Sequence, residues 1–305
     1  MHSLEISILK VIAYFDIFSY PLTSAEIVFF LDRPVGESEL CVVLNRLVDA
    51  GQLWKHGEFY SAKEEDSCAK KRIQSNSTAQ RHIEHAGKVA KFLYRLPYIN
   101  GIAISGSLSK KCADENSDLD FFIITKAGRL WIVRIIYSIL FKIARIAGIK
   151  NWFCLNYFIA EPALEIKEHN LFTAVEVSTL MPLKGEAVFR KFFSANDWVY
   201  SYQPNYKPDF SYLDEAPIGS IKKVAEWFMN FEYGNYIDNR LLLFFQKRFE
   251  KIKAENKLSE KGMIIGAYEA SKHACKPMPQ YFQPKILAMF QERFLKLKEK
   301  YSSSS

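Results

Sequence analysis

Two short motifs, ten residues apart, hold the side chains of this sequence that are best suited to chemistry. The first is Gly106-Ser107 and the second is Asp118-Leu119-Asp120, and each adjoins an apolar run that predicts a buried strand. A glycine where a strand stops lets the backbone approach a ligand closely, and the turn that follows offers free N–H groups to an anion. Gly106 and Ser107 are therefore candidates for binding a phosphate.

The second motif predicts a pair of carboxylates on one face of a strand, because side chains alternate along a strand. Two residues of rise, at about 3.3 Å each, would separate Asp118 from Asp120 by roughly 6.6 Å. Carboxylates this near repel each other, and a divalent cation relieves that repulsion. Mg²⁺ commonly binds one or two carboxylates together with substrate phosphates, so both aspartates are candidate metal ligands.

Two lysines, Lys110 and Lys111, lie in the loop between the motifs. Their ammonium groups could neutralise phosphate charge, which makes them candidate nucleotide-binding residues. Loop lysines are also commonly solvated, and the sequence leaves both interpretations open.

The order of strand, Gly-Ser, ten residues, Asp-hydrophobic-Asp and apolar strand resembles the signature of the polymerase-β-like nucleotidyltransferase superfamily. The resemblance implies that Gly106 and Ser107 hold the triphosphate of a nucleoside triphosphate. It implies further that Asp118 and Asp120 hold Mg²⁺ for attack on the α-phosphate. The expected reaction is transfer of a nucleoside monophosphate to an unidentified acceptor.

The family normally draws a third carboxylate from a later strand, and here the sequence departs from the pattern. The apolar segment 152–160 contains no acid, and Asn156 is its only strongly polar residue. An amide can ligate a metal but cannot act as a base, so Asn156 is either the third catalytic residue or a structural hydrogen-bonder. Glu161 would lie on the opposite face of a regular strand. A catalytically inactive nucleotide-binding sensor or scaffold therefore remains the alternative.

The elements around these motifs predict an α+β fold in three parts. Residues 1–62 follow the order helix, helix, helix, hairpin and resemble a winged helix-turn-helix module, with a capping box at Thr23–Glu26. Residues 70–165 would form the mixed-sheet nucleotidyltransferase core, and residues 166–300 a mainly helical region. We expect a polar link over 63–77, a helix over 79–93 and a loop over 201–217.

Charge argues against DNA binding by the N-terminal module. The chain carries a net charge of +7, but residues 1–60 hold four Lys/Arg against eight Asp/Glu, a net of −4. An acidic surface repels the DNA backbone. We therefore expect this module to serve in packing or protein contacts rather than in binding DNA.

The composition, with 49% hydrophobic and 25% charged residues, is typical of a globular protein. The longest apolar stretch, 130–147, carries Arg134, Lys142 and Arg145, and predicts a buried amphipathic helix rather than a membrane span. Five scattered cysteines without a Cys-x-x-Cys pair indicate reduced thiols, and the N-terminus lacks the pattern of a secretory leader. We expect a cytoplasmic protein.

Overall fold

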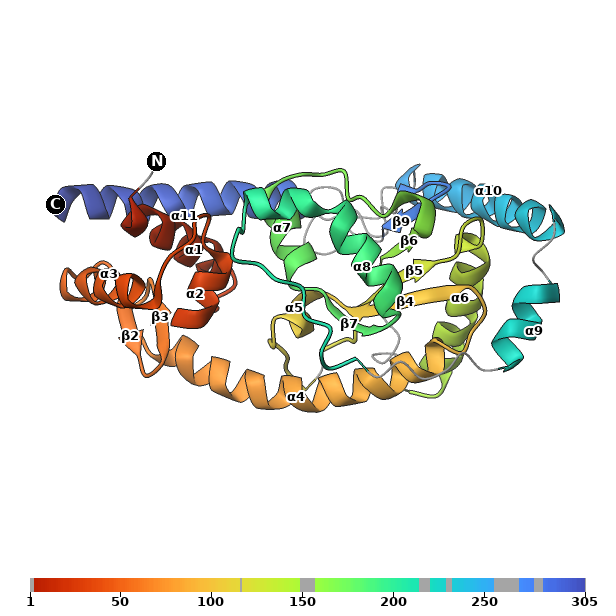
Figure 1. Cartoon of the computed structure of the whole chain (residues 1–305), viewed down its shortest axis with the longest axis horizontal. Coiled ribbons are helices and arrows are strands. Elements are labelled where there is room, and N and C mark those ends of the chain that lie inside the picture. Colours follow the sequence, from red (N-terminus) through yellow and green to blue (C-terminus); the bar gives the residue numbers. More distant parts are fainter. Residues whose placement is uncertain are drawn as a thin grey trace.

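The computed structural model describes residues 3–115, 117–148, 157–213, 220–228, 232–254, 269–276 and 282–304. Its fold is α+β, with a small helical module at one end and a mixed sheet at the other (Figure 1). A long helix, α4 (Ser67–Leu93), runs from the module along the sheet.

The N-terminal module consists of three helices and a three-stranded antiparallel sheet in the order β1-β3-β2. Its elements are α1 (Leu4–Asp16), β1 (Leu22–Thr23), α2 (Ser24–Phe30), α3 (Glu37–Asp49), β2 (Trp54–His56) and β3 (Phe59–Ser61). The capping box is present, since the Thr23 hydroxyl accepts from Glu26 N–H and the Glu26 carboxylate accepts from Thr23 N–H. It fixes where α2 begins.

Helix α4 (Ser67–Leu93) is 27 residues long. The expected polar link over 63–77 is therefore wrong for most of its length, because the helix starts at Ser67 rather than near Ala79. Two residues of the early turns, Ala69 and Arg72, are buried. Packing against the N-terminal module thus stabilises a stretch whose own sequence has little apolar periodicity.

The main sheet has six strands in the order β7-β4-β5-β6-β9-β8. They are β4 (Ile99–Ile104), β5 (Phe121–Thr125), β6 (Phe158–Ala160), β7 (Met181–Lys184), β8 (Glu269–Ala270) and β9 (Ala274–Lys276). The β5–β6 pair is parallel and the other pairs are antiparallel. The sheet extends past the expected boundary at residue 165, because both of its edges come from the region expected to be mainly helical.

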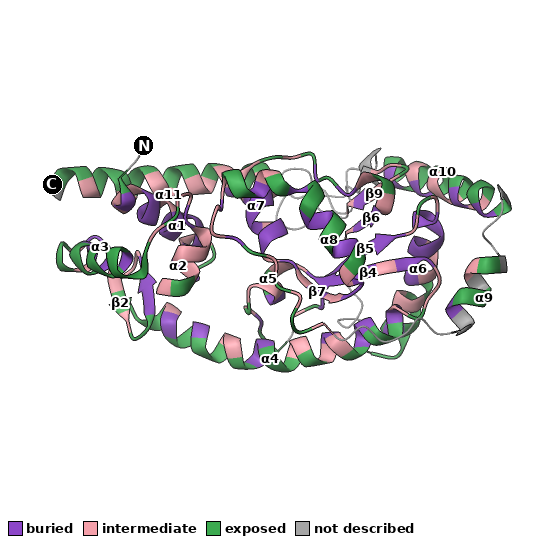
Figure 2. Cartoon of the chain, viewed as in Figure 1, coloured by how far each residue is buried: buried purple, intermediate pink, exposed green. Residues whose placement is uncertain are grey.

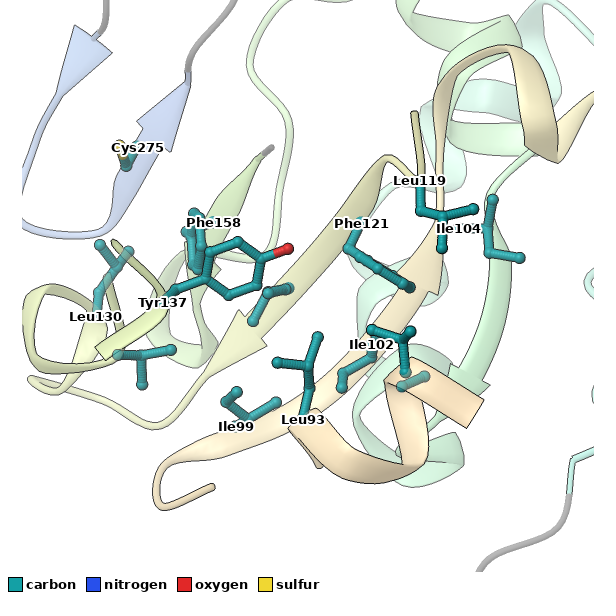
Figure 3. Close-up of a cluster of buried hydrophobic side chains, with 14 of the residues drawn as sticks. Leu93, Ile99, Ile102, Ile104, Leu119, Phe121, Leu130, Tyr137, Phe158 and Cys275 are labelled. Carbon is teal, nitrogen blue, oxygen red and sulfur yellow. The ribbon is translucent and has the colours of Figure 1, made fainter. Parts of the chain in front are cut away.

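Helices cover both faces of this sheet. Besides α4, the helices described between the module and residue 254 are α5 (Gly106–Ser109), α6 (Leu130–Ile146), α7 (Leu171–Ser178), α8 (Glu186–Ala195), α9 (Ser220–Phe228), α10 (Glu232–Ala254) and the short 3₁₀ helices Glu161–Ala163 and Asp197–Ser201. Ile102, Ile104 and Phe121 point into one core beneath α4 and α6 (Figure 3). Phe122 and Ile124 point into the opposite core, with α8.

The last helix, α11 (Phe282–Ser304), lies along α1 of the N-terminal module (Figure 1). The rings of Tyr14 and Phe290 are 6.0 Å apart, and Arg293 pairs with Asp16. The outer faces of α4 and α11 are largely exposed (Figure 2). Helix α11 thus packs against α1.

Within the described ranges, no helix combines the length and apolar character needed to cross a membrane. Helix α6 matches the amphipathic helix expected over 130–147. Cys41, Cys68, Cys112 and Cys275 are free thiols.

Candidate functional site

The turn after β4 brings the first motif against the second. Ser105 N–H donates to the carbonyl of Asp120 at 2.9 Å, which extends the β4–β5 pairing by one residue. Gly106 then adopts a left-handed conformation with φ +69°. A Cβ at position 106 would be 2.6 Å from Oδ2 of Asp120, so the carboxylate lies directly against the glycine.

The side chain of Asp120 points away from the α4–α6 core. Its neighbours Leu119 and Phe121 are both buried in that core (Figure 3). Alternation therefore places Asp120 on the opposite face, where it is half-buried. Asp118 precedes the strand and is exposed. The carboxylate of Asp120 thus lies beside the Gly106 turn, whereas Asp118 is exposed to solvent.

Ser107 lies in the first turn of α5 and is exposed. Its carbonyl accepts from Lys110 N–H at 3.0 Å and from Cys112 N–H at 3.0 Å. Those bonds use the backbone oxygen of Ser107, and the residue is exposed next to Gly106.

Lys110 is engaged by the protein. Its ammonium is 2.8 Å from a carboxylate oxygen of Glu176 on α7 and 3.1 Å from the carbonyl of Gly106. Only 16% of the Lys110 side chain is exposed. Lys110 therefore braces the Gly106 turn against α7, and it would have to leave Glu176 to meet a phosphate.

Lys111 is exposed and has φ +56°. The backbone just before it is tied to the N-terminal module, because the Tyr20 hydroxyl donates to the Lys110 carbonyl. The same hydroxyl is 3.4 Å from Glu26. The N-terminal module thus contacts the loop that joins the two motifs.

The structure describes only one of the two residues, Asn156 and Glu161, that could occupy the position of a third acidic ligand. Asn156 lies outside the described residues. Glu161 follows β6, whose last residue Ala160 pairs with Thr125 at the far end of β5 from Asp120. At about 3.3 Å per residue, that end is roughly 16 Å away along the strand, so Glu161 does not join the aspartates.

In the part of the chain that the structure describes, no group of three or more His, Cys, Asp or Glu residues could hold a metal ion. A cation at this site would therefore rely on Asp118 and Asp120, with further ligands from a substrate. Carboxylate oxygens suit Mg²⁺, which accepts this mode of binding.

Comparisons with protein-family models, with curated proteins and with solved structures found no match. Function is therefore inferred from the residues and geometry of the site itself.

Three residues near this site were not among the sequence-based candidates: Tyr20, Glu26 and Glu176. Glu176 is 66 residues from Lys110 in the chain, and Tyr20 is 90 residues from it. No local spacing signals contacts over such separations. The capping box singled out Glu26, but only as an element of helix α2.

Proposed function

We propose that this protein transfers a nucleoside monophosphate from a nucleoside triphosphate to an acceptor in a Mg²⁺-dependent reaction. The observation that carries the proposal is the contact between Gly106 and the Asp120 carboxylate. It joins a backbone turn suited to phosphate with an acidic group suited to a metal.

Each residue would have a limited task. Gly106 would admit the phosphates close to the backbone, and the Ser107 hydroxyl would donate to a phosphate oxygen. Asp118 and Asp120 would hold Mg²⁺, which supplies positive charge to the reacting phosphate oxygens. The bond from the α-phosphorus to the α–β bridging oxygen would break, pyrophosphate would leave with that oxygen, and the acceptor's oxygen or nitrogen would bond to the α-phosphorus and release its proton to solvent.

The direct test measures binding of each labelled nucleoside triphosphate and release of pyrophosphate, with and without Mg²⁺. Wild type is compared with the double variant Asp118→Asn/Asp120→Asn. We expect Mg²⁺-dependent binding and turnover in wild type and loss of both in the variant. The matched control is Glu115→Gln, which neutralises an exposed acid of the same loop and should retain both.

A folded wild-type protein that binds none of the nucleotides would refute the proposal. Binding that survives in the double variant would refute the roles assigned to the aspartates.

A second candidate is nucleotide binding without transfer, as in a sensor or scaffold. The observation that favours it is the lack of a third acidic ligand among the residues that are described. Mg²⁺-dependent binding that needs the aspartates but releases no pyrophosphate, with a broad panel of acceptors, would favour this candidate.

We propose for the N-terminal module a role in packing or protein contacts rather than in DNA binding. The exposed side of α3 carries Glu37, Glu39 and Asp49, and the Arg46 guanidinium is 2.9 Å from Glu5. A gel shift with random DNA at low salt tests this assignment. Tight, salt-sensitive binding that is lost on changing the α3 surface would contradict it.

A further inference from the structure

A cavity of about 280 Å³ lies between the N-terminal module and the sheet domain. Its walls come from six places: Phe15 of α1, α2 with the segment before it, the end of α5, the turn between α7 and β7, Phe193 of α8, and the segment 206–212. These segments are far apart in sequence. The cavity therefore exists only when the module is docked on the rest of the chain.

One wall is a continuous set of aromatic rings. Phe15 and Phe30 are 4.5 Å apart, Phe29 and Phe30 are 4.8 Å apart, and Phe29 and Tyr206 are 5.8 Å apart, each measured between ring centroids. Tyr212 adds a half-exposed ring at the rim. Such a wall suits a flat apolar ring system.

The charges around the cavity do not cancel. Five charged residues contribute to its walls, namely Glu26, Lys110, Lys111, Lys207 and Asp209. Glu26 is 2.6 Å from Arg72, and Lys110 is 2.8 Å from Glu176, so protein partners neutralise those two. The remainder, two lysines and one aspartate, gives a net charge of +1.

The two lysines are placed to meet a ligand. Lys111 and Lys207 are both exposed. The Asp209 carboxylate is turned to its own loop, where it accepts from Ser211 N–H at 2.8 Å. The rim of an aromatic cavity therefore offers two ammonium groups to an anion.

The cavity shares Lys110 and Lys111 with the candidate nucleotide site but not the rest of it. Neither the Gly106-Ser107 turn nor the two aspartates contribute to its walls. It adjoins that site only through Ser109 and the lysines that follow. Its occupant would thus lie beside the transferred phosphates without replacing them.

We propose that this cavity binds a small planar aromatic molecule that carries one anionic group, such as an aromatic carboxylate. The ring system lies against the wall that contains Phe29 and Tyr206, and the anion faces Lys111 and Lys207. The inference does not depend on the transfer reaction.

The test uses the full chain with 2-naphthoate and its neutral analogue 2-naphthalenemethanol, titrated by isothermal calorimetry. We expect 2-naphthoate to bind about tenfold more tightly than the alcohol, since two partly exposed ion contacts together supply about that factor. Lys111→Ala/Lys207→Ala should abolish this preference. Tyr212→Ala should weaken both probes. Lys91→Ala, an exposed lysine of α4, serves as the control and should change neither.

The outcomes separate this proposal from the proposed transfer reaction. Asp118→Asn/Asp120→Asn should still bind 2-naphthoate, even where it loses nucleotide binding. Failure of both probes to bind folded wild type would overturn the proposal, as would binding that the lining variants leave unchanged. Loss of 2-naphthoate binding in the aspartate variant would show that the cavity belongs to the nucleotide site.

Discussion

Gly106 and Asp120 are in direct contact, although they belong to different motifs separated by the α5 loop. The glycine has φ +69°, and the space that a side chain would need at position 106 is taken by Oδ2 of Asp120 at 2.6 Å. Position 106 is therefore constrained twice. Its backbone conformation is one that L residues with a side chain rarely adopt, and the Asp120 carboxylate occupies the space that a side chain would need. This contact fixes the turn relative to the acid.

Gly106→Ala tests that contact. We expect the free energy of unfolding to fall by about 1–2 kcal/mol from the left-handed conformation alone, and the methyl group to displace the Asp120 carboxylate. Mg²⁺-dependent nucleotide binding should weaken accordingly. Chemical denaturation and nucleotide titration measure the two effects.

The control is Gly87→Ala in α4, where an added Cβ meets no atom within 4 Å. Glycine inside a helix costs about 0.5–1 kcal/mol relative to alanine, so this variant should be more stable than wild type with nucleotide binding unchanged. Equal behaviour of the two variants would contradict the special role of position 106.

The sequence predicted the parts of the site that depend on local pattern. Apolar runs on either side of Gly106 and Asp120 identified β4 and β5, because alternation and chain breaks are visible in a single stretch of residues. The amphipathic pattern predicted α6 over 130–147, and the helix spans Leu130–Ile146.

Elements that depend on distant partners were not predictable in this way. Strands β7, β8 and β9 have two to four residues each, too few to display alternation. The sequence predicts a polar link around Arg72, yet Arg72 is buried and pairs with Glu26, which lies 46 residues away. The ion pair between Lys110 and Glu176 was not predictable for the same reason, since 66 residues separate the two side chains in the sequence.

The ion pair between Arg72 and Glu26 should contribute more to stability than a surface pair of equal length. Its atoms are 2.6 Å apart with 3% of the Arg72 side chain exposed, and the Arg72 guanidinium lies 3.6 Å from the Tyr20 ring centroid. Burial lowers the pKa of Arg72 to about 10, so the group stays charged at neutral pH. Arg72→Met should lower the free energy of unfolding by about 3 kcal/mol, since it takes from the partly buried Glu26 carboxylate the guanidinium that it pairs with.

Arg81 provides the comparison for that measurement. It also lies 2.6 Å from a carboxylate, that of Glu115, but 64% and 70% of the two side chains are exposed. Arg81→Met should therefore cost less than about 1 kcal/mol. If urea denaturation gives equal losses for the two variants, burial is not what strengthens the Arg72 pair.

Asp238, a residue of α10, caps the start of helix α6. Its Oδ1 accepts from the N–H groups of Trp131 at 2.8 Å and Ile132 at 3.0 Å, at the start of α6. Asp238→Ala should lower the free energy of unfolding by about 1–2 kcal/mol, the usual cost of losing an N-terminal cap. Asp238→Asn keeps a carbonyl oxygen and should recover most of that loss. An asparagine variant as unstable as the alanine variant would show that the charge, not the hydrogen bonds, stabilises α6.

Lys222 should make stability depend on alkaline pH. Its ammonium donates to the carbonyl of Tyr94 at 3.1 Å and is buried, and burial lowers its pKa to about 8 against the opposing effect of Glu226. Between about pH 8 and the ordinary lysine value near 10.4, the unfolded chain binds more protons at this position than the folded chain. The contribution of Lys222 to stability therefore rises with pH across that window.

The measurement is the difference in unfolding free energy between wild type and Lys222→Met, taken from pH 7 to pH 10. Taking the difference removes the contributions of other groups that titrate in this range. We expect wild type to gain about 1–3 kcal/mol relative to the variant as the pH rises. Lys223→Met, which alters the exposed neighbour, should follow wild type throughout. A pH-independent difference for Lys222→Met would mean that the buried ammonium keeps an ordinary pKa, with its hydrogen bonds offsetting the cost of burial.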